Sequence, residues 1–100
     1  MGSRKQGVET IRMPDCVKDY YPSQALRLKQ EGSVVVKLCI GVDNKIDGPV
    51  EVLTSSGFPV LDEAASQCVG AGRYKAGVIN GAPARTCEAV WVHFAPLEGR

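Results

Sequence analysis

The 100-residue chain has no long hydrophobic run, only 6% aromatic residues and a single histidine. Its apolar stretches are far shorter than the ~18 residues that a membrane-spanning helix needs, so no transmembrane segment is predicted. No apolar segment follows the basic residues near the start, as a signal peptide would require. Twelve basic and 11 acidic residues are interspersed and give a net charge of +1. This balance argues against binding to nucleic acid or to a membrane through a polybasic surface.

The residue patterns of common catalytic and metal sites are also missing. Cys87 and His93 share one face of a predicted strand, but at roughly 3.3 Å per residue they are about 20 Å apart, too far for a nucleophile and its base. The cysteines do not form the closely spaced pairs of a structural zinc site. The glycines at 70–72 follow a predicted helix, whereas the phosphate-binding turn of a dinucleotide site follows a strand. We therefore expect no enzyme, no cofactor and no metal.

Four cysteines, Cys16, Cys39, Cys68 and Cys87, are the most informative residues present. An even number of widely spaced cysteines in a small domain is typical of two disulfides, and so of an oxidising compartment such as the periplasm. The alternative is four free, buried cysteines in a cytosolic protein. Four cysteines allow three connectivities, and their spacing alone does not choose among them.

Hydrophobic periodicity predicts two helices and three strands. The first helix begins near Pro22 and ends at Gly32, and the second begins at Pro59 and ends at residues 70–72. Alternation of apolar residues predicts a strand over 33–42, followed by a turn and a second strand near 50–54. The third strand covers about 85–94. Two shorter features are also predicted: an extended segment at Arg73–Lys75 and a turn at Asn80-Gly81 with Pro83.

These elements predict a single α+β domain over residues 15–97. Residues 1–14 are expected to be a flexible N-terminal segment, because the first seven are polar and without period, and residues 98–100 are expected to be a tail. If the mature protein is periplasmic, its export or anchoring segment is expected upstream of this sequence.

Short connections and right-handed crossovers favour a three-stranded antiparallel sheet with the 33–42 strand central and two helices packed on one face. Nine apolar side chains would then face the helices: Val34, Val36, Leu38, Ile40, Val50, Val52, Val90, Val92 and Phe94. Cys39 and Cys87 fall on the opposite face of adjacent strands, where directly opposed Cβ atoms lie about 4.5–5.5 Å apart. This placement favours a Cys39–Cys87 disulfide and leaves Cys16 for Cys68.

An ordered set of short motifs runs along the chain: Tyr21-Pro22-x-x-Ala25, Glu31-Gly32-x-Val34-x-Val36-x-Leu38-x-Ile40, and Val52-x-x-Ser55-Ser56-Gly57-x-x-x-Leu61-Asp62-x-Ala64-Ala65. Arg73-Tyr74-x-Ala76-Gly77, Asn80-Gly81-x-Pro83 and Val90-x-Val92-x-Phe94 follow. Together these motifs resemble the C-terminal domain of TonB-family proteins from about Cys16 to Pro96. The sequence departs from the family at residues 70–72, where many relatives continue the helix into a basic and aromatic end.

The resemblance implies a periplasmic energy-transducing domain. In the family, an inner-membrane anchor and a proline-rich spacer precede the domain, and a motor complex driven by the proton-motive force acts through that region. The domain binds the TonB box of an outer-membrane transporter by adding it as a strand to a sheet edge. Many members also pair a cysteine of the first strand with one near the start of the last, as Cys39 and Cys87 would.

The last strand is the expected partner-binding edge, because an edge strand presents unpaired N–H and C=O groups to an extended peptide. Trp91 is its expected aromatic anchor. The predicted partner-binding residues are Cys87, Glu88, Ala89, Val90, Trp91, Val92, His93 and Phe94. The alternative is a scaffold strand whose edge is covered by a tail or, in a homodimer, by a second copy of the chain.

Two other functions compete with energy transduction. One is a structural or assembly domain of the same fold in an envelope or secretion complex, without energy coupling. The other is a periplasmic redox protein with an exchangeable disulfide. The redox function is disfavoured because Cys39 and Cys87 lie on predicted strands and the sequence has no C-x-x-C motif.

Overall fold

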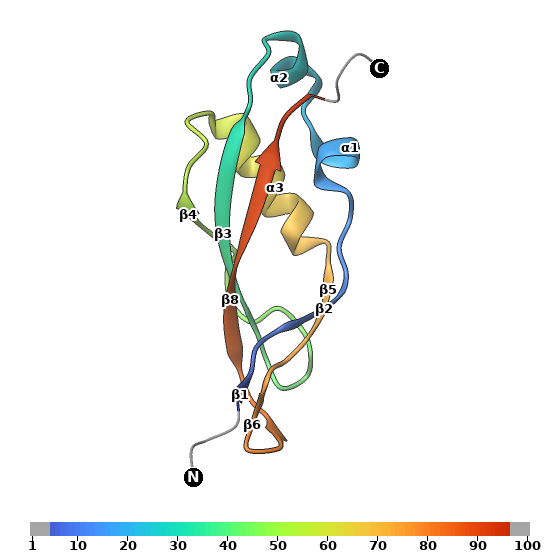
Figure 1. The fold of residues 1–100 in the computed structure, drawn as a ribbon, viewed down its shortest axis with the longest axis vertical. Coiled ribbons are helices and arrows are strands. Elements are labelled where there is room, and N and C mark those ends of the chain that lie inside the picture. The colour runs from blue at the N-terminus through green and yellow to red at the C-terminus, as the bar shows by residue number, and fades with distance from the viewer. Residues whose placement is uncertain (1–4, 97–100) are drawn as a thin grey trace.

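Strand β3 (Gly32–Ile40) is the centre of a three-stranded antiparallel sheet, between β4 (Glu51–Thr54) and β8 (Thr86–Phe94). The computed structural model describes residues 5–96, and Figure 1 shows β3 and β8 running along the long axis of the molecule. β3 and β8 pair with each other over all nine residues of each strand. The order and direction of the three strands confirm the predicted sheet.

Three helices are present in the described part of the chain: α1 (Cys16–Tyr20), α2 (Ser23–Arg27) and α3 (Pro59–Gly70). α3 contacts all three strands of the central sheet, and α1 contacts α3 and β8. Figure 1 shows α3 crossing behind the sheet, whereas α2 lies beyond one end of it. The buried residues of α3 repeat at helical spacing: Leu61, Ala64, Ala65, Cys68 and Val69.

The predicted helix over 22–32 is shorter than expected. α2 ends at Arg27, because Lys29 adopts a positive φ of 55° that a continuing α-helix does not allow. The Gln30 N–H then bonds back to the Ala25 carbonyl at 2.8 Å and closes the end of the helix.

Helix α1 was not expected, although a local signal for it exists. Asp15 is its N-cap, and its side chain accepts a hydrogen bond from the Lys18 N–H at 3.0 Å. The helix has only five residues, too few to be stable alone or to show an apolar period. Its stability must therefore come from tertiary contacts, which the sequence pattern does not display.

Five further strands are short: β1 (Lys5–Gln6), β2 (Glu9–Arg12), β5 (Arg73–Lys75), β6 (Val78–Ile79) and β7 (Ala82–Pro83). β2 pairs with β5, and β6 pairs with both β1 and β7. No element was predicted before residue 15, and β1 and β2 were missed because neither is long enough to show alternation. The first four residues and the predicted tail over 98–100 lie outside the described residues.

The smaller predicted features at 73–83 are confirmed. Arg73–Lys75 is strand β5, and Asn80-Gly81 is the turn between β6 and β7. Both turn residues have positive φ, 52° at Asn80 and 83° at Gly81, as a two-residue hairpin turn of type I′ requires.

The core lies between α3 and the central sheet and contains most of the residues predicted to face the helices. Six of the nine are buried: Val34, Val36, Leu38, Ile40, Val92 and Phe94. Val50 and Val90 are partly buried against them. Val52 was predicted to face the helices, but it is 40% exposed although its cross-strand partner Val36 is fully buried. The reason is that β4 is a four-residue edge strand with no neighbour on its outer side among the described residues.

The Ser55-Ser56-Gly57 turn is tied to the start of α3 by Asp62. The Asp62 carboxylate accepts hydrogen bonds from the Ser55 hydroxyl, from the Ser56 N–H at 2.8 Å and from the Ser56 hydroxyl at 2.8 Å. Gly57 has a φ of 95°, which favours glycine. Partial burial raises the pKa of Asp62, but the hydrogen bonds from Ser55 and Ser56 outweigh it, so the pKa lies below its usual value.

We expect Asp62→Asn to lower the free energy of unfolding by about 2 kcal/mol at neutral pH, because hydrogen bonds to the charged carboxylate are lost. Since the folded-state pKa is depressed, this stabilisation is present above the unfolded pKa of about 4 and is lost as pH falls through the folded value. Urea unfolding of both proteins from pH 7 to pH 2 measures it. The matched control is Glu63→Gln on the same helix, and an equal effect of the two substitutions at pH 7 would contradict the expectation.

Candidate functional site

Among the described residues, strand β8 is paired along one edge and unpaired along the other. Its only strand partner within residues 5–96 is β3. The Cα atoms of Cys39 and Cys87 are 3.9 Å apart, the close approach of a non-hydrogen-bonded pair in an antiparallel ladder. Because such pairs alternate with hydrogen-bonded ones, the N–H and C=O groups of Cys87, Ala89, Trp91 and His93 point away from β3.

These outward backbone groups have no partner in the described part of the chain. None of the backbone hydrogen bonds outside the regular helices and strands of residues 5–96 involves β8. The free edge therefore offers four N–H donors and four C=O acceptors at alternate residues. An edge of this length is open to pairing with another extended segment unless something covers it.

The side chains of β8 divide between the two faces of the sheet. Val92 and Phe94 are buried in the core, and the Phe94 ring packs edge-on against Tyr21 with centroids 5.2 Å apart. On the other face, Trp91 is 72% exposed, and His93 Nδ1 lies 2.7 Å from Ser33 Oγ on β3. Val92 and Phe94 thus direct their backbone N–H and C=O groups toward β3 and their side chains into the core. Trp91 and His93 instead have exposed side chains and backbone groups that point away from β3.

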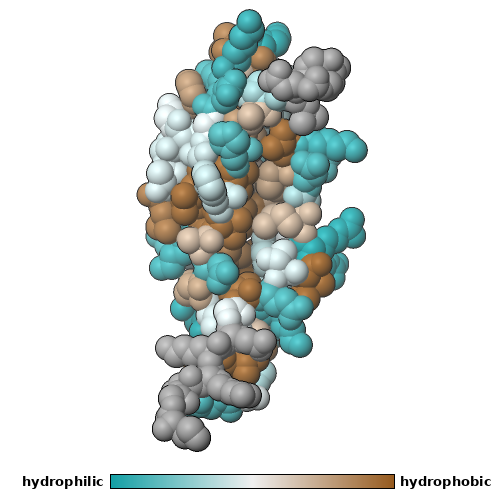
Figure 2. Space-filling model, in the orientation of Figure 1, coloured by the Kyte–Doolittle hydropathy of each residue, from teal (hydrophilic) through white to brown (hydrophobic). Residues whose placement is uncertain are grey.

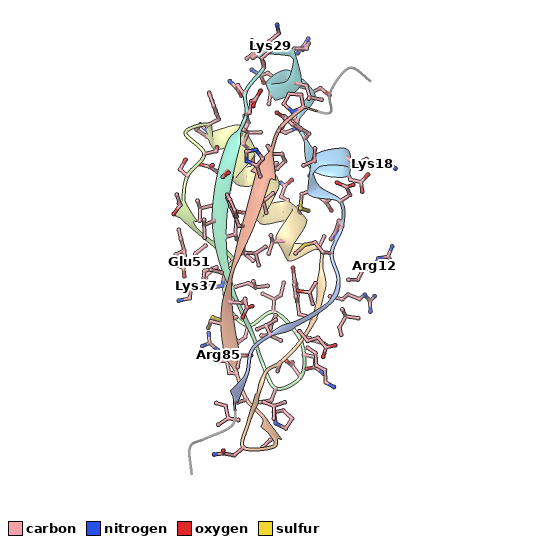
Figure 3. All side chains as sticks on the ribbon, viewed as in Figure 1. Arg12, Lys18, Lys29, Lys37, Glu51 and Arg85 are labelled. Carbon is pink, nitrogen blue, oxygen red and sulfur yellow. A yellow bond between two sulfur atoms is a disulfide. The ribbon has the colours of Figure 1, made fainter. Side chains whose placement is uncertain are left out.

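The remaining predicted site residues lie around the middle and the start of β8. Cys87, Glu88 and Ala89 are exposed, and Val90 is partly buried. Figure 2 shows apolar side chains gathered over the middle of the sheet, with hydrophilic residues around them. Lys37 is the cross-strand partner of Glu51 on β4, and Figure 3 labels the two residues near each other.

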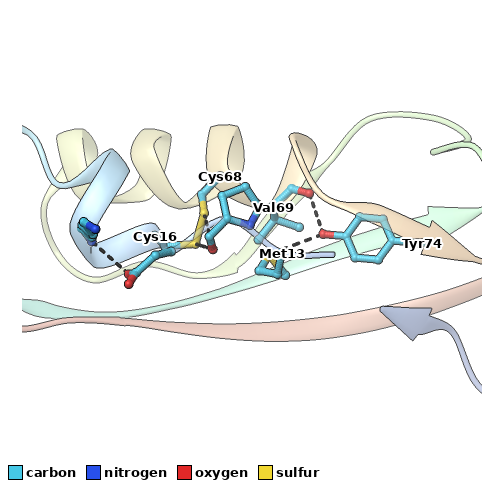
Figure 4. Close-up of a disulfide and its surroundings, with 8 residues drawn as sticks. Met13, Cys16, Cys68, Val69 and Tyr74 are labelled. Atoms are coloured by element: carbon cyan, nitrogen blue, oxygen red, sulfur yellow. Dashed lines mark hydrogen bonds between the residues drawn. A yellow bond between two sulfur atoms is a disulfide. The ribbon is translucent and has the colours of Figure 1, made fainter. Parts of the chain in front are cut away.

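Both predicted disulfides are present, and residues 5–96 contain no free cysteine. Cys39–Cys87 joins β3 to β8 near the start of the free edge. Cys16–Cys68 joins α1 to α3, with Cα atoms 5.6 Å apart (Figure 4). Since α1 also contacts β8, this second disulfide holds in place the element that lies beside the edge strand.

Tyr74 lies in the surroundings of the Cys16–Cys68 disulfide. Its hydroxyl donates a hydrogen bond to the Val69 carbonyl at 2.6 Å and contacts Met13 Sδ at 3.7 Å (Figure 4). Burial raises the pKa of the Tyr74 hydroxyl, so it remains a donor at neutral pH. Tyr74 thereby joins the C-terminal turn of α3 to β5 and to the segment that leads into α1.

No helix within residues 5–96 is long and apolar enough to cross a membrane. No group of three histidine, cysteine, aspartate or glutamate residues in the same range is placed to hold a metal ion.

An α+β domain with a long unpaired strand edge belongs to the class of domains that can bind extended peptides. A family model described as the Gram-negative bacterial TonB protein C-terminal matches residues 17–96. The chain therefore belongs to the TonB C-terminal domain family, as its motifs predicted. Domains of this family are periplasmic and interact with outer-membrane transporters. A comparison with curated proteins gave no match.

We expect Cys39→Ala/Cys87→Ala to lower the free energy of unfolding by roughly 4 kcal/mol, because each disulfide closes a loop of about fifty residues in the unfolded chain. Guanidinium denaturation measures this loss, and Cys16→Ala/Cys68→Ala should cause a similar one. Amide hydrogen exchange distinguishes the two variants. Only loss of Cys39–Cys87 should speed exchange at the amides of residues 86, 88 and 90, which face β3, and an unchanged rate there would show that the disulfide does not secure the edge strand.

Proposed function

We propose that the chain is the periplasmic C-terminal domain of an energy transducer and binds the TonB box of an outer-membrane transporter. The bound segment adds to the free edge of β8 as a further strand of the sheet. The domain acts by binding alone and carries out no reaction of its own. The observation that carries the proposal is the unpaired edge of β8, with its four outward N–H groups and four outward C=O groups.

Main-chain pairing supports a role in which one domain serves transporters of different sequence. Backbone hydrogen bonds supply affinity at this edge, and they make few demands on the side chains of the peptide. Trp91 supplies the specific contact, since a large exposed aromatic ring beside the edge can pack on one side chain of the added strand. α1 borders the same strand and limits how the peptide can enter.

Energy coupling requires that force on the bound strand reach the rest of the domain without stripping β8 away. Two features of the structure support this requirement. β8 is held by a nine-residue ladder to β3, and the Cys39–Cys87 disulfide adds a covalent link. In the proposal, an upstream inner-membrane anchor and spacer connect the domain to the proton-driven motor complex, and the sheet carries the load between motor and transporter.

We expect Trp91→Ala to weaken binding of synthetic peptides from transporter plug segments by about tenfold, as loss of an aromatic anchor typically does. The thermal melting temperature should change little, because Trp91 is 72% exposed. NMR titration measures affinity and shows which amides shift, and these should be residues 85–94 rather than the helices. Leu53→Ala, at an exposed position on the opposite edge strand, is the control. Equal affinities for the two variants would argue against a Trp91 anchor.

A proline pair tests the backbone pairing directly. Ala89→Pro removes an outward N–H that the fold does not use, so the domain should fold while peptide affinity falls about fivefold. Glu88→Pro removes an N–H that bonds to β3, so it should instead destabilise the domain by about 3 kcal/mol.

The outcomes for these two proline variants separate energy transduction from an assembly role without energy coupling. Full peptide affinity in Ala89→Pro would overturn strand addition at β8. In cells, the same variant in the full-length protein should reduce proton-motive-force-dependent uptake. Uptake that is unchanged although peptide affinity has fallen would favour an assembly role without energy coupling.

A further inference from the structure

A pocket separate from the β8 edge lies between the β3–β4 loop and the β2–β5 pair. Its volume is about 460 Å³, within the range of small-ligand sites. None of its lining residues belongs to β8: they are Ile11, Asn44, Lys45, Ile46, Gly72, Arg73 and Tyr74. The site therefore does not rest on the function proposed above.

Hydrogen bonds hold the walls of the pocket in place. The Asn44 side chain accepts from the Ala76 N–H at 2.8 Å, which fastens the β3–β4 loop to the segment after β5. Within the loop, the Gly41 N–H bonds to the Lys45 carbonyl at 2.9 Å and the Asn44 N–H to the Gly41 carbonyl at 2.8 Å. These bonds hold the loop that carries Lys45 next to the β5 segment that carries Arg73, and both residues line the pocket.

Gly72, one of the lining residues, has no room for a side chain. A Cβ atom at Gly72 would lie 2.5 Å from the Tyr74 hydroxyl oxygen and 3.0 Å from the Arg12 carbonyl oxygen. Because Tyr74 is fixed by its hydrogen bond to Val69, a larger residue would have to displace it. The position of the Gly72–Tyr74 wall is thus fixed by the fold, whereas Ile11, Lys45 and Arg73 line the pocket as exposed residues.

The charge of the pocket is one-sided. Lys45 and Arg73 line it, and no acidic residue does. Arg12 is the cross-strand partner of Arg73, an arrangement of like charges that disfavours the strand pair when nothing compensates it. Within residues 5–96 the only ion pair is Arg85–Asp47, so none of these three cations has an acidic partner. Figure 3 shows the Arg12 side chain pointing away from the body of the protein.

The pocket also has an apolar part. Ile11, which is 57% exposed, and the partly buried Ile46 lie beside the two cations. A simple inorganic anion would leave this apolar surface in water. A ligand that carries a carboxylate next to an aliphatic side chain would satisfy the cations and cover Ile11 at the same time.

We propose that this pocket binds an acidic peptide segment in which glutamate or aspartate is next to an aliphatic residue. A membrane surface fits less well, because electrostatic attachment to anionic lipid takes a cluster of about four to eight cations. The chain has a net charge of only +1, and only two of its cations line the pocket. The domain would then hold two peptide segments, one by main-chain pairing at β8 and one by charge here.

The test uses a blocked tetrapeptide, leucine-glutamate-glutamate-leucine, and its counterpart with glutamine in place of glutamate. The acidic peptide should shift the amide resonances of residues 44–46 and 72–74, and the glutamine peptide should bind about fivefold more weakly. Lys45→Gln/Arg73→Gln should also weaken the acidic peptide about fivefold, the size expected for two exposed charge pairs. Lys18→Gln/Arg27→Gln removes the same charge elsewhere and should leave binding within twofold.

Several results would overturn the proposal. These are absence of binding by the acidic peptide, equal binding of the two peptides, equal effects of the two double variants, or shifts confined to β8. Vesicles of phosphatidylglycerol and phosphatidylcholine provide the remaining arm. Binding to these vesicles that depends on Lys45 and Arg73, without binding of the peptide, would assign the pocket to a lipid surface instead. Thermal melts of both double variants establish that they are folded.

Discussion

The nine-residue ladder between β3 and β8 is the constraint on which the rest of the structure depends. β3 uses both of its edges, one for β4 and one for β8, whereas β8 uses only one. The same ladder directs the apolar side chains of both strands toward α3, so the register that fills the core also leaves one row of β8 backbone groups without a strand partner in the described part of the chain. The core and the proposed binding edge therefore depend on a single pairing, and a slip by one residue would disrupt both.

The two disulfides add stability that a small domain cannot obtain from packing alone. α1 is too short to be stable as an isolated helix, and Cys16–Cys68 fixes it to α3. Cys39–Cys87 secures the strand that has only one neighbour. An exposed edge invites uncontrolled association, so natural proteins usually cover or shorten it. A long, covalently secured edge with no second strand partner within residues 5–96 is consistent with a strand that is kept available for a partner.

The sequence predicted those parts of the fold whose signals are local and repeated. β3 follows from its alternating valines, and α3 from the spacing of Leu61, Ala64, Ala65 and Cys68. The end of α2 at Arg27 depends on the positive φ of Lys29. Lysine has no preference for positive φ, so the sequence does not indicate this helix end. β1 and β2 are stabilised by partners 61 to 74 residues away in the chain, so no local pattern identifies them.

For the candidate site, the sequence by itself determined that the last strand is amphipathic, that Trp91 and His93 share its polar face, and that Cys39 and Cys87 can be joined. It did not determine which backbone groups of β8 are free, because that depends on which cross-strand pairs are hydrogen-bonded. Nor could it bring Ile11, Lys45 and Arg73 into one pocket, since they come from three distant segments. Side-chain periodicity is a property of one segment, so the sequence shows it. Strand register and pockets arise only when distant segments come together, so only the tertiary structure decided them.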